Sequence, residues 1–256
     1  MTNLEVNDLG LRLMDDALVP TTAMVLAAGL GKRMRPITDT IPKPLVKIAD
    51  KALLDWGLDS LASVGVKRAV VNVHYLPDQI VAHVKQRHTP RIVISDEREG
   101  LLDSAGGIIK ALPNLGVRFY VLNADTFWIE REVSNLSRLA HAWRGAKMDI
   151  LLMLAELQSA TGHCGSSDFL MASDGTLRRS KGDPAGLIYA GAAIVHKRIF
   201  NDAPSGPHSL NAYFDKAIAA GRLFGMKMQG HWITVGTPDA IPAAEAAVAG
   251  ALAKAV

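Results

Sequence analysis

The residues best suited to chemistry are glycines and fixed cations that follow an apolar segment near the start of the chain. Ala28 is followed by Gly29 and Gly31, and Arg33 and Lys43 come next along the same loop. Glycine lets backbone N–H groups approach an anion closely. Arginine offers a planar fork for phosphate oxygens, and lysine offers a point charge. This order of residue types predicts a phosphate-binding loop.

A glycine pair after a strand is also common in ordinary tight turns, so the two glycines alone are weak evidence. Here Pro36, Pro42 and Pro44 stiffen a long loop where a helix would otherwise begin. The prolines and the cations together favour an anion site over a simple turn.

A carboxylate follows a second apolar segment, in Asn123-Ala124-Asp125. In open α/β sheets ligands bind beyond the carboxyl ends of the strands. Asp125 is therefore well placed to hold a divalent cation against phosphates. The alternative is that Asp125 only caps a turn.

Small residues open a helix in Asp103-Ser104-Ala105-Gly106. Such a start exposes backbone donors and allows a flat base or a ribose to come close. A plain helix start explains the pattern equally well. Taken alone, the later Gly236-Thr237-Pro238 turn has a structural explanation, with Thr237 as N-cap and Pro238 at the first helical position.

These motifs together resemble the signature of the sugar-1-phosphate nucleotidyltransferases. The resemblance rests on Leu-Ala-Ala-Gly-x-Gly-x-Arg-Met-x-Pro-x-Thr, followed by Pro-Lys-Pro around Lys43, and it spans roughly residues 23–250. Within that family the chain most resembles the bacterial N-acetylmuramate-1-phosphate uridylyltransferases of cell-wall recycling. The Asp168-Phe169 and His231-Trp232 pairs are among the residues that carry this narrower likeness.

The resemblance implies that a nucleoside monophosphate passes from a triphosphate, UTP, to a sugar 1-phosphate, N-acetylmuramate 1-phosphate, with Mg²⁺ as cofactor and release of pyrophosphate. It implies that Gly29 and Gly31 cradle the triphosphate and that Arg33 neutralises it. Lys43 would orient the sugar phosphate, and Asp125 would bind Mg²⁺. Further positions fall where the family contacts the nucleotide (Ala28, Asn72, Asp103, Ser104, Ala105, Gly106) and the sugar (Asn123, Asp168, Lys181, Gly191).

The chain departs from the family pattern at two places. Thr234 stands where many members have an aspartate as second metal ligand, and a neutral hydroxyl is a poor ligand for a hard cation. Asp103-Ser104-Ala105 replaces the Glu-Thr-Gly of close relatives. Two alternatives therefore stay open: a guanylyl- or thymidylyltransferase acting on mannose, heptose or glucose 1-phosphate, and a non-catalytic nucleotide-sugar-binding regulatory subunit.

The composition is that of an ordinary globular enzyme. The 256 residues are 49% hydrophobic and 21% charged, with a formal net charge of +3. This charge is too small, and too evenly spread, to indicate a nucleic-acid partner. Cys164 is the single cysteine, which excludes an internal disulfide. No apolar run reaches the roughly 18 residues of a membrane span, and residues 1–20 lack the basic start of a secretory signal, so we expect a cytoplasmic protein. The sequence leaves the oligomeric state open.

The segments that must position these residues alternate between apolar runs and amphipathic stretches, a pattern typical of a mostly parallel sheet covered by helices. We expect strands at 23–28, 68–73, 91–95, 118–123 and 149–155, and helices at 53–64, 77–87 and 105–112.

After residue 160 the strand-like segments become shorter, and they favour an antiparallel addition to the sheet. These segments are 169–172, 176–179 and 187–195. Two further short strands are expected at 224–228 and 231–235, and helices at 210–220 and 238–253. The expected fold is a Rossmann-like α/β fold with a mixed, mostly parallel sheet, of the nucleotide-diphospho-sugar transferase type. It would form one domain over residues 21–256, preceded by an N-terminal extension over residues 1–20.

Overall fold

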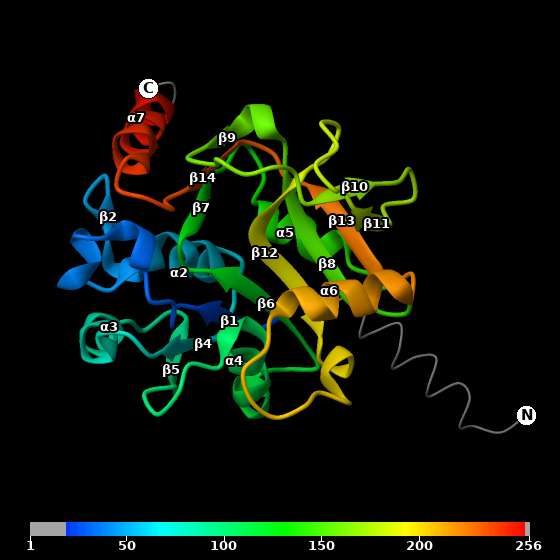
Figure 1. Cartoon of the computed structure of the whole chain (residues 1–256), viewed down its shortest axis with the longest axis horizontal. Helices are drawn as coiled ribbons and strands as arrows, with labels where there is room; N and C mark the ends of the chain where they lie inside the picture. The colour runs from blue at the N-terminus through cyan, green and yellow to red at the C-terminus, as the bar shows by residue number, and fades with distance from the viewer. Residues whose placement is uncertain (1–18, 254–256) are drawn as a thin grey trace, which may run out of the picture.

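A seven-stranded sheet forms the centre of the computed structural model, in which residues 19–253 are described (Figure 1). Its strands are β1 (Thr22–Leu26), β4 (Arg68–Val73), β5 (Arg91–Asp96), β6 (Arg118–Asn123), β8 (Ile150–Ala155), β12 (Ile188–His196) and β13 (Leu223–Lys227). They lie in the order β13-β8-β12-β6-β1-β4-β5. β12 is antiparallel to both of its neighbours, and the other pairings are parallel. The predicted mixed, mostly parallel sheet is confirmed.

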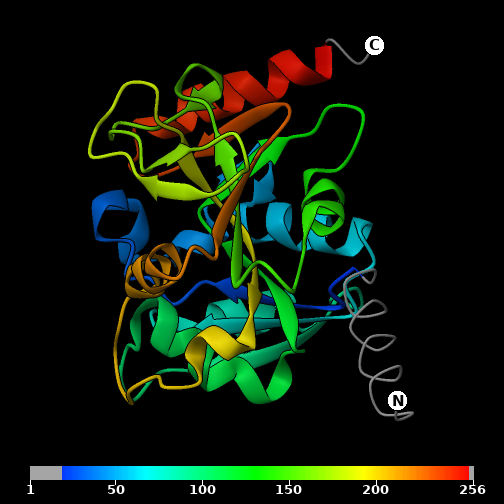
Figure 2. The same ribbon diagram turned by 90° about the vertical axis from the view of Figure 1, so that its right-hand side faces the viewer.

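Helices cover both faces of this sheet, which explains why β1 and β8 are apolar along nearly their whole length. On one face, α2 (Leu53–Ser63), α3 (Pro77–Val84) and α5 (Asn135–Ala142) share a core with the strands. On the other face, α4 (Asp103–Ala111) and α6 (Leu210–Ala219) pack together over a second core (Figure 2).

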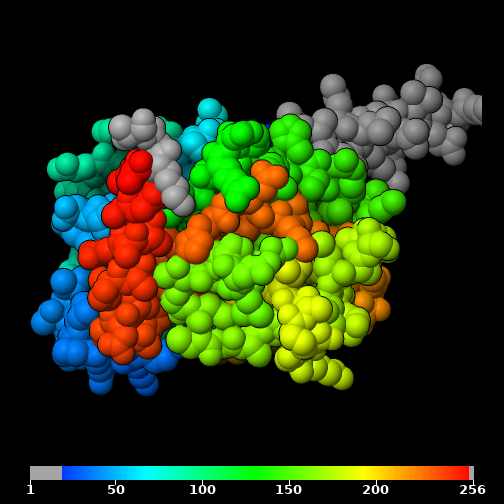
Figure 3. Space-filling view, turned by 90° about the horizontal axis from the view of Figure 1, so that it is seen from above, coloured from blue at the N-terminus to red at the C-terminus, as the bar shows by residue number. Residues whose placement is uncertain are grey.

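A separate three-stranded sheet lies beyond the carboxyl end of β6. It consists of β7 (Thr126–Ile129), β14 (His231–Thr234) and β9 (Ala160–Thr161), in the order β7-β14-β9. The last helix, α7 (Ala240–Ala253), packs against β14 and β9 (Figure 3). Two antiparallel ribbons complete the strands: β2 (Lys47–Ile48) with β3 (Lys51–Ala52), and β10 (Phe169–Met171) with β11 (Leu177–Arg179). Short 3-10 helices occupy Lys32–Met34, Ile37–Asp39, Lys43–Leu45, Leu112–Asn114, Leu157–Ser159 and Lys197–Phe200.

The structure departs from the prediction in three ways. Of the segments expected to extend the main sheet, 169–172 and 176–179 instead form the β10–β11 ribbon, whereas 187–195 joins the sheet as β12. The short strand expected at 231–235 lies in the separate sheet. The helices α4 and α7 are displaced from their predicted starts. α4 begins at Asp103, two residues early, and α7 begins at Ala240 rather than Pro238, because residues 237–239 form a turn in which the Thr237 carbonyl accepts a hydrogen bond from the Ala240 amide. β7 and α5 were not predicted.

No helix in the described part of the chain is both long and apolar enough to cross a membrane. The predicted N-terminal extension lies outside the described residues, except for Val19 and Pro20.

Candidate active site

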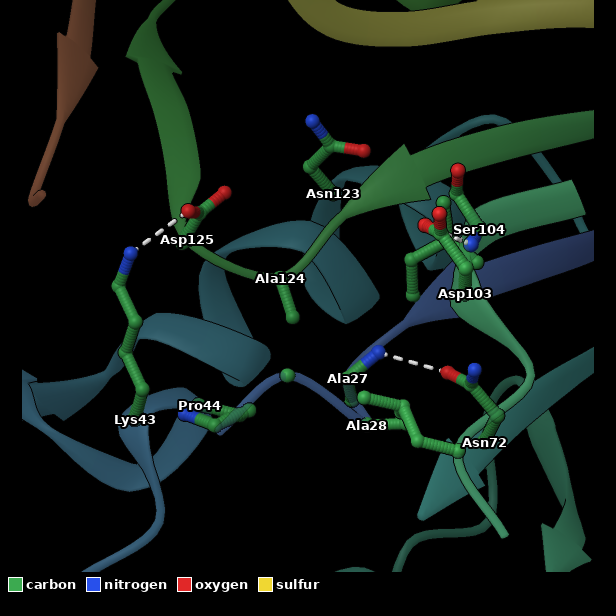
Figure 4. Close-up of a pocket in the computed structure, with 13 residues that line it drawn as sticks. Ala27, Ala28, Lys43, Pro44, Asn72, Asp103, Ser104, Asn123, Ala124 and Asp125 are labelled. Atoms are coloured by element: carbon green, nitrogen blue, oxygen red, sulfur yellow. Dashed lines mark hydrogen bonds and ion pairs between the residues drawn. The ribbon is translucent and has the colours of Figure 1, made fainter. Parts of the chain in front are cut away.

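A cleft of about 270 Å³ opens at the carboxyl ends of β1 and β6 (Figure 4). Lys43 and Asp125 lie on one side of it, Asp103 and Ser104 lie on the other, and Asn123 lies between them. Eight of the residues predicted for the site line this cleft: Ala28, Gly29, Lys43, Asn72, Asp103, Ser104, Asn123 and Asp125. Because they come from distant parts of the sequence, their meeting in one place supports the predicted site.

The glycine loop leaves β1 and turns beside Lys43. Gly31 has a φ of +62°, a conformation that favours glycine. A Cβ atom at Gly31 would lie 3.1 Å from Thr38 Cγ2 and 3.2 Å from Lys43 Cβ. The Thr38 hydroxyl donates a 2.8 Å hydrogen bond to the Gly31 carbonyl. Gly31 does not line the cleft itself; it allows the loop to fold back so that Lys43 reaches the cleft.

Lys43 and Asp125 form an ion pair on one side of the cleft. Lys43 Nζ lies 2.6 Å from Asp125 Oδ2, and the two side chains are 12% and 36% exposed. The remaining carboxylate oxygen, Oδ1, accepts no hydrogen bond from a described residue. A partly exposed carboxylate beside a fixed cation can therefore receive a further positive group without giving up this contact.

Arg33 lies at the edge of the site and does not line the cleft. It is exposed in the 3-10 helix Lys32–Met34, and its guanidinium is 3.8–4.0 Å from the position that a Cβ atom would take at Gly236. Within residues 19–253, Arg33 makes no hydrogen bond or ion pair, so its charge is available to a ligand. The glycine loop and the Gly236-Thr237 turn thus approach each other through this side chain.

The side chain of Asn72 is held in place by the buried carboxylate of Glu97. Its Oδ1 accepts a 2.7 Å hydrogen bond from the Ala27 amide, and its Nδ2 donates a 2.8 Å hydrogen bond to Glu97 Oε1. Glu97 is only 1% exposed, and its Oε2 accepts a hydrogen bond from the Leu102 amide. Glu97 therefore connects the start of the glycine loop to the start of α4. A Cβ atom at Gly107 would lie 2.7 Å from Glu97 Oε1, so this approach requires glycine.

The start of α4 differs from the expected set of free backbone donors. The amides of Ala105 and Gly106 both donate to the His208 carbonyl, at 3.0 and 3.3 Å, and both residues are buried outside the cleft. The expectation that these amides are exposed was wrong, because the loop before α6 covers them. Ser104 and Asp103 remain at the surface of the cleft, and Ser104 Oγ accepts a hydrogen bond from the Leu210 amide.

A second pocket of about 210 Å³ adjoins the cleft and shares Leu26, Ser104 and Asn123 with it. Asp168 lines this pocket, and its Oδ2 accepts a 2.9 Å hydrogen bond from the Tyr189 amide. Because they share these residues, the two hollows form one continuous space from the glycine loop to Asp168.

Gly191 supports Asn123 from β12, at a break in the register of the β12–β8 pairing. Its φ is +76°, and a Cβ atom there would lie 2.3 Å from Thr126 Oγ1 and 3.2 Å from Asn123 Cβ. Gly191 does not line either hollow, so its contribution is the space that it leaves for Asn123 and Thr126. The predicted sugar-binding residue Lys181 is exposed in the turn after β11 and also lines neither hollow.

Tyr189 was not predicted. It lines the second pocket, and its hydroxyl is shielded from solvent without a hydrogen-bond partner in the described structure. Burial raises the pKa of this phenol well above its ordinary value, and the negative charge of Asp125 raises it further. The hydroxyl is therefore a neutral donor. Because buried hydroxyls are normally paired, it is a candidate to donate to a ligand.

Comparison with known proteins shows the family of this chain. The family model for nucleotidyl transferases matches residues 22–163. An N-acetylmuramate alpha-1-phosphate uridylyltransferase from Caulobacter vibrioides is 44% identical over 236 residues, covering 90% of this chain and 98% of that protein. The chain belongs to the nucleotidyl transferase family. A protein of the same name from Neisseria meningitidis serogroup B is 33% identical over 88% of this chain and 96% of its own length.

A solved structure shares the fold of this nucleotidyl transferase. The inositol-1-phosphate CTP transferase from T. maritima superposes with a TM-score of 0.73, over 91% of this chain and 96% of that one, at 19% identity. This likeness supports the fold prediction and, at that identity, nothing finer.

Nucleotidyl transferases commonly use a divalent metal, and the donor set beside Lys43 fits one in part. Thr234, which replaces the expected second carboxylate, pairs with Thr126 next to Asp125, and the adjoining Val235 amide donates to the Asp125 carbonyl. No group of three or more acidic, histidine or cysteine side chains among residues 19–253 could form a metal cluster. Magnesium often binds through one carboxylate, substrate phosphates and water, and Asp125 alone meets that requirement.

Proposed function

We propose that this protein transfers a uridylyl group from UTP to N-acetylmuramate 1-phosphate, with release of pyrophosphate. The observation that carries the proposal is the meeting of Gly29, Lys43 and Asp125 in a cleft continuous with a second, sugar-sized pocket. The choice of base and sugar follows the two relatives that share 44% and 33% identity over most of this chain.

The chemical step is attack of a sugar-phosphate oxygen on the α-phosphorus of the triphosphate. A phosphate monoester is already ionised near neutral pH, so the step requires no general base, and positioning and charge neutralisation supply the catalysis. At about 4 Å and an effective dielectric constant of about 20, two unit negative charges repel by roughly 4 kcal/mol. The fixed cations of the site must offset this repulsion.

The two cations act on different phosphates. Lys43 is held beside the cleft by its ion pair with Asp125. There it orients the sugar phosphate for in-line attack. The Arg33 side chain is exposed at the end of the glycine loop and has no partner in the described structure. It can therefore move with the triphosphate and neutralise the departing pyrophosphate. Backbone amides at Ala28 and Gly29 bind the triphosphate oxygens.

Asp125 would hold Mg²⁺, with phosphate oxygens and water completing its ligands. The bound ion would supply further neutralisation of the charge on the reacting phosphates. Asp125 has one oxygen committed to Lys43 and one without a partner, which leaves room for this role.

The experiment is to measure pyrophosphate release for UTP, GTP, CTP and dTTP, each with N-acetylmuramate, N-acetylglucosamine, mannose or glucose 1-phosphate. We expect UTP with N-acetylmuramate 1-phosphate to give the highest kcat/KM. Preference for GTP with mannose 1-phosphate would instead favour a guanylyltransferase. Absence of release with every pair would favour a regulatory binding protein, consistent with Thr234 in the metal position.

A Lys43→Ala variant links the activity to the cleft. It should lower kcat by about 100-fold or more, the usual effect of removing a charge-stabilising donor. Lys47→Ala is the matched control, because Lys47 is exposed in β2 and does not line the cleft. Equal activity of Lys43→Ala and Lys47→Ala would exclude a catalytic role for Lys43.

A further inference from the structure

The second pocket contains a cation to which the transfer reaction assigns no role. Arg179, at the end of β11, is the one lysine or arginine among the described residues that line this pocket. The cations of the phosphate chemistry, Lys43 and Arg33, line the first cleft or its edge. Arg179 therefore faces a different part of any ligand that fills both hollows.

The Arg179 side chain is oriented by two hydrogen bonds and two aromatic rings. Its Nε donates a 2.8 Å hydrogen bond to Asp215 Oδ1, and Nη2 donates to the Asn211 carbonyl at 3.2 Å. Its guanidinium carbon lies 4.8 Å from the centre of the Phe169 ring and 5.9 Å from that of Phe214. Nη1 donates no hydrogen bond within the described structure. A guanidinium that is held in place and has Nη1 unpaired is suited to donate hydrogen bonds to an anionic group in a defined direction.

The way in which the cleft and the second pocket meet indicates which part of a bound sugar would lie near Arg179. The two hollows meet at Leu26, Ser104 and Asn123, so a sugar in the second pocket would direct its 1-phosphate toward the first cleft and Lys43. Substituents elsewhere on the ring would then face Asp168 or Arg179. Asp168 Oδ1 has no partner in the described structure and suits a sugar hydroxyl, whereas Arg179 suits an acidic substituent.

We infer that Arg179 binds a carboxylate carried by the sugar and so selects acidic sugar 1-phosphates over neutral ones. This inference rests on the proposed function, because N-acetylmuramate differs from N-acetylglucosamine by a lactyl ether that bears a carboxylate. Asp168 and Asp215 also carry negative charge near the pocket. The selection therefore comes from a directional hydrogen bond to Nη1 rather than from the net charge of the pocket.

The test compares N-acetylmuramate 1-phosphate with N-acetylglucosamine 1-phosphate, using UTP throughout. Arg179→Gln should lower kcat/KM for the acidic sugar by about 10- to 100-fold, mainly through KM, since a charge-assisted hydrogen bond is lost. The value for the neutral sugar should stay within about twofold. Arg179→Lys, which keeps the charge but loses the fork, should fall between Arg179→Gln and the wild type.

Arg178→Gln is the matched control. Arg178 is the preceding residue of the same strand, is exposed, and has its side chain on the opposite face of the ribbon. It should retain the wild-type ratio of the two sugars. Equal loss with both sugars in Arg179→Gln, or no change with either, would overturn the role of Arg179 while leaving the proposed function intact.

A change in the substrate, tested with the wild-type protein, gives a result that does not depend on how a variant folds. The methyl ester of the lactyl carboxylate, assayed with the wild-type protein, should lose about as much kcat/KM as Arg179→Gln loses with the acid. Equal use of acid and ester by the wild type would also contradict the inference. If the wild type releases no pyrophosphate with either sugar, the proposed function itself has failed, and that result is distinct from both others.

Discussion

The proposed chemistry depends most on one ion pair, that of Lys43 and Asp125, in which Nζ lies 2.6 Å from Oδ2. It joins the loop after β1 to the segment after β6, and in the free protein each charge neutralises the other. Both charges therefore stay in place beside the cleft without a ligand. Ligands then meet groups that are already oriented, and such preorganisation is a large part of electrostatic catalysis.

Replacing the Asp125 carboxylate by an amide of the same shape tests its proposed metal role. Asp125→Asn should lower kcat by about 100-fold or more, because the amide is a weaker ligand and leaves Lys43 without its partner. A magnesium titration of the rate should shift to higher concentration. Asp39→Asn serves as control, since Asp39 is exposed and lies outside the cleft. An unchanged titration in Asp125→Asn would exclude the metal role.

Two tyrosines should respond in opposite ways to loss of their hydroxyls. Tyr189→Phe removes a buried hydroxyl without a partner, so the free energy of unfolding should stay the same or rise by up to about 1 kcal/mol. Its kcat/KM should fall about tenfold if a ligand uses that donor. Tyr120→Phe removes a hydrogen bond to the Leu136 carbonyl, so it should lose about 1 kcal/mol of stability and keep its activity. Urea unfolding and initial rates measure both effects, and full activity of Tyr189→Phe would exclude the ligand contact.

The elements of the site converge because β1, β4 and β6 are parallel, so their carboxyl ends lie at the same edge of the sheet. That convergence was predictable from the sequence, because apolar runs marked the strands and a candidate site residue stood near the carboxyl end of each of them. The support beneath the site was not predictable. Glu97 is an ordinary acidic residue in the sequence, and only the pairing of β4 with β5 brings it to Asn72.

The glycines of these elements offer a paired test. A Cβ atom at Gly29 would meet nothing within 4 Å, whereas at Gly107 it would lie 2.7 Å from Glu97 Oε1. Gly107→Ala should therefore cost about 1–3 kcal/mol of stability through overpacking. Gly29→Ala should leave the melting temperature unchanged and raise KM for UTP, because the added methyl group occupies space that a phosphate requires. A normal KM for UTP in Gly29→Ala would contradict the placement of the triphosphate.

The parts of the fold that the sequence did not predict are those decided by distant contacts. β7 is only four residues long and is ordered by pairing with β14, more than a hundred residues later. The β10 and β11 segments have apolar residues typical of strands, but nothing in their pattern says which sheet they join. For such short segments tertiary pairing outweighs local preference.

The buried carboxylate of Asp149 connects three segments of the chain that flank the main sheet. Asp149 Oδ1, just before β8, accepts hydrogen bonds from Nε of both Arg198 and Arg222. Burial alone would raise the pKa of Asp149, but the hydrogen bonds and charges of the two arginines outweigh it and hold the pKa below its ordinary value of 3.8. The ionised form therefore stabilises the fold.

The pH dependence of stability follows from this lowered pKa. The contribution of Asp149 should be complete above pH 3.8, the ordinary value, and should be lost as the pH falls from there through the lower pKa of the folded state. Asp149→Asn should cost about 2 kcal/mol at neutral pH. The difference between wild type and variant in urea unfolding should be constant from pH 7 to about 5 and should shrink below 3.8. A difference that grows on acidification would contradict this account.

The products of one reaction test the proposed function of the protein most directly. We would incubate the purified protein with UTP, N-acetylmuramate 1-phosphate and Mg²⁺ and follow the phosphorus nuclei by NMR. We predict equal amounts of pyrophosphate and a uridine diphosphate sugar, formed only when both substrates and the metal are present. Orthophosphate or UMP in place of the nucleotide sugar, or no change in the spectrum, would contradict the proposed uridylyl transfer.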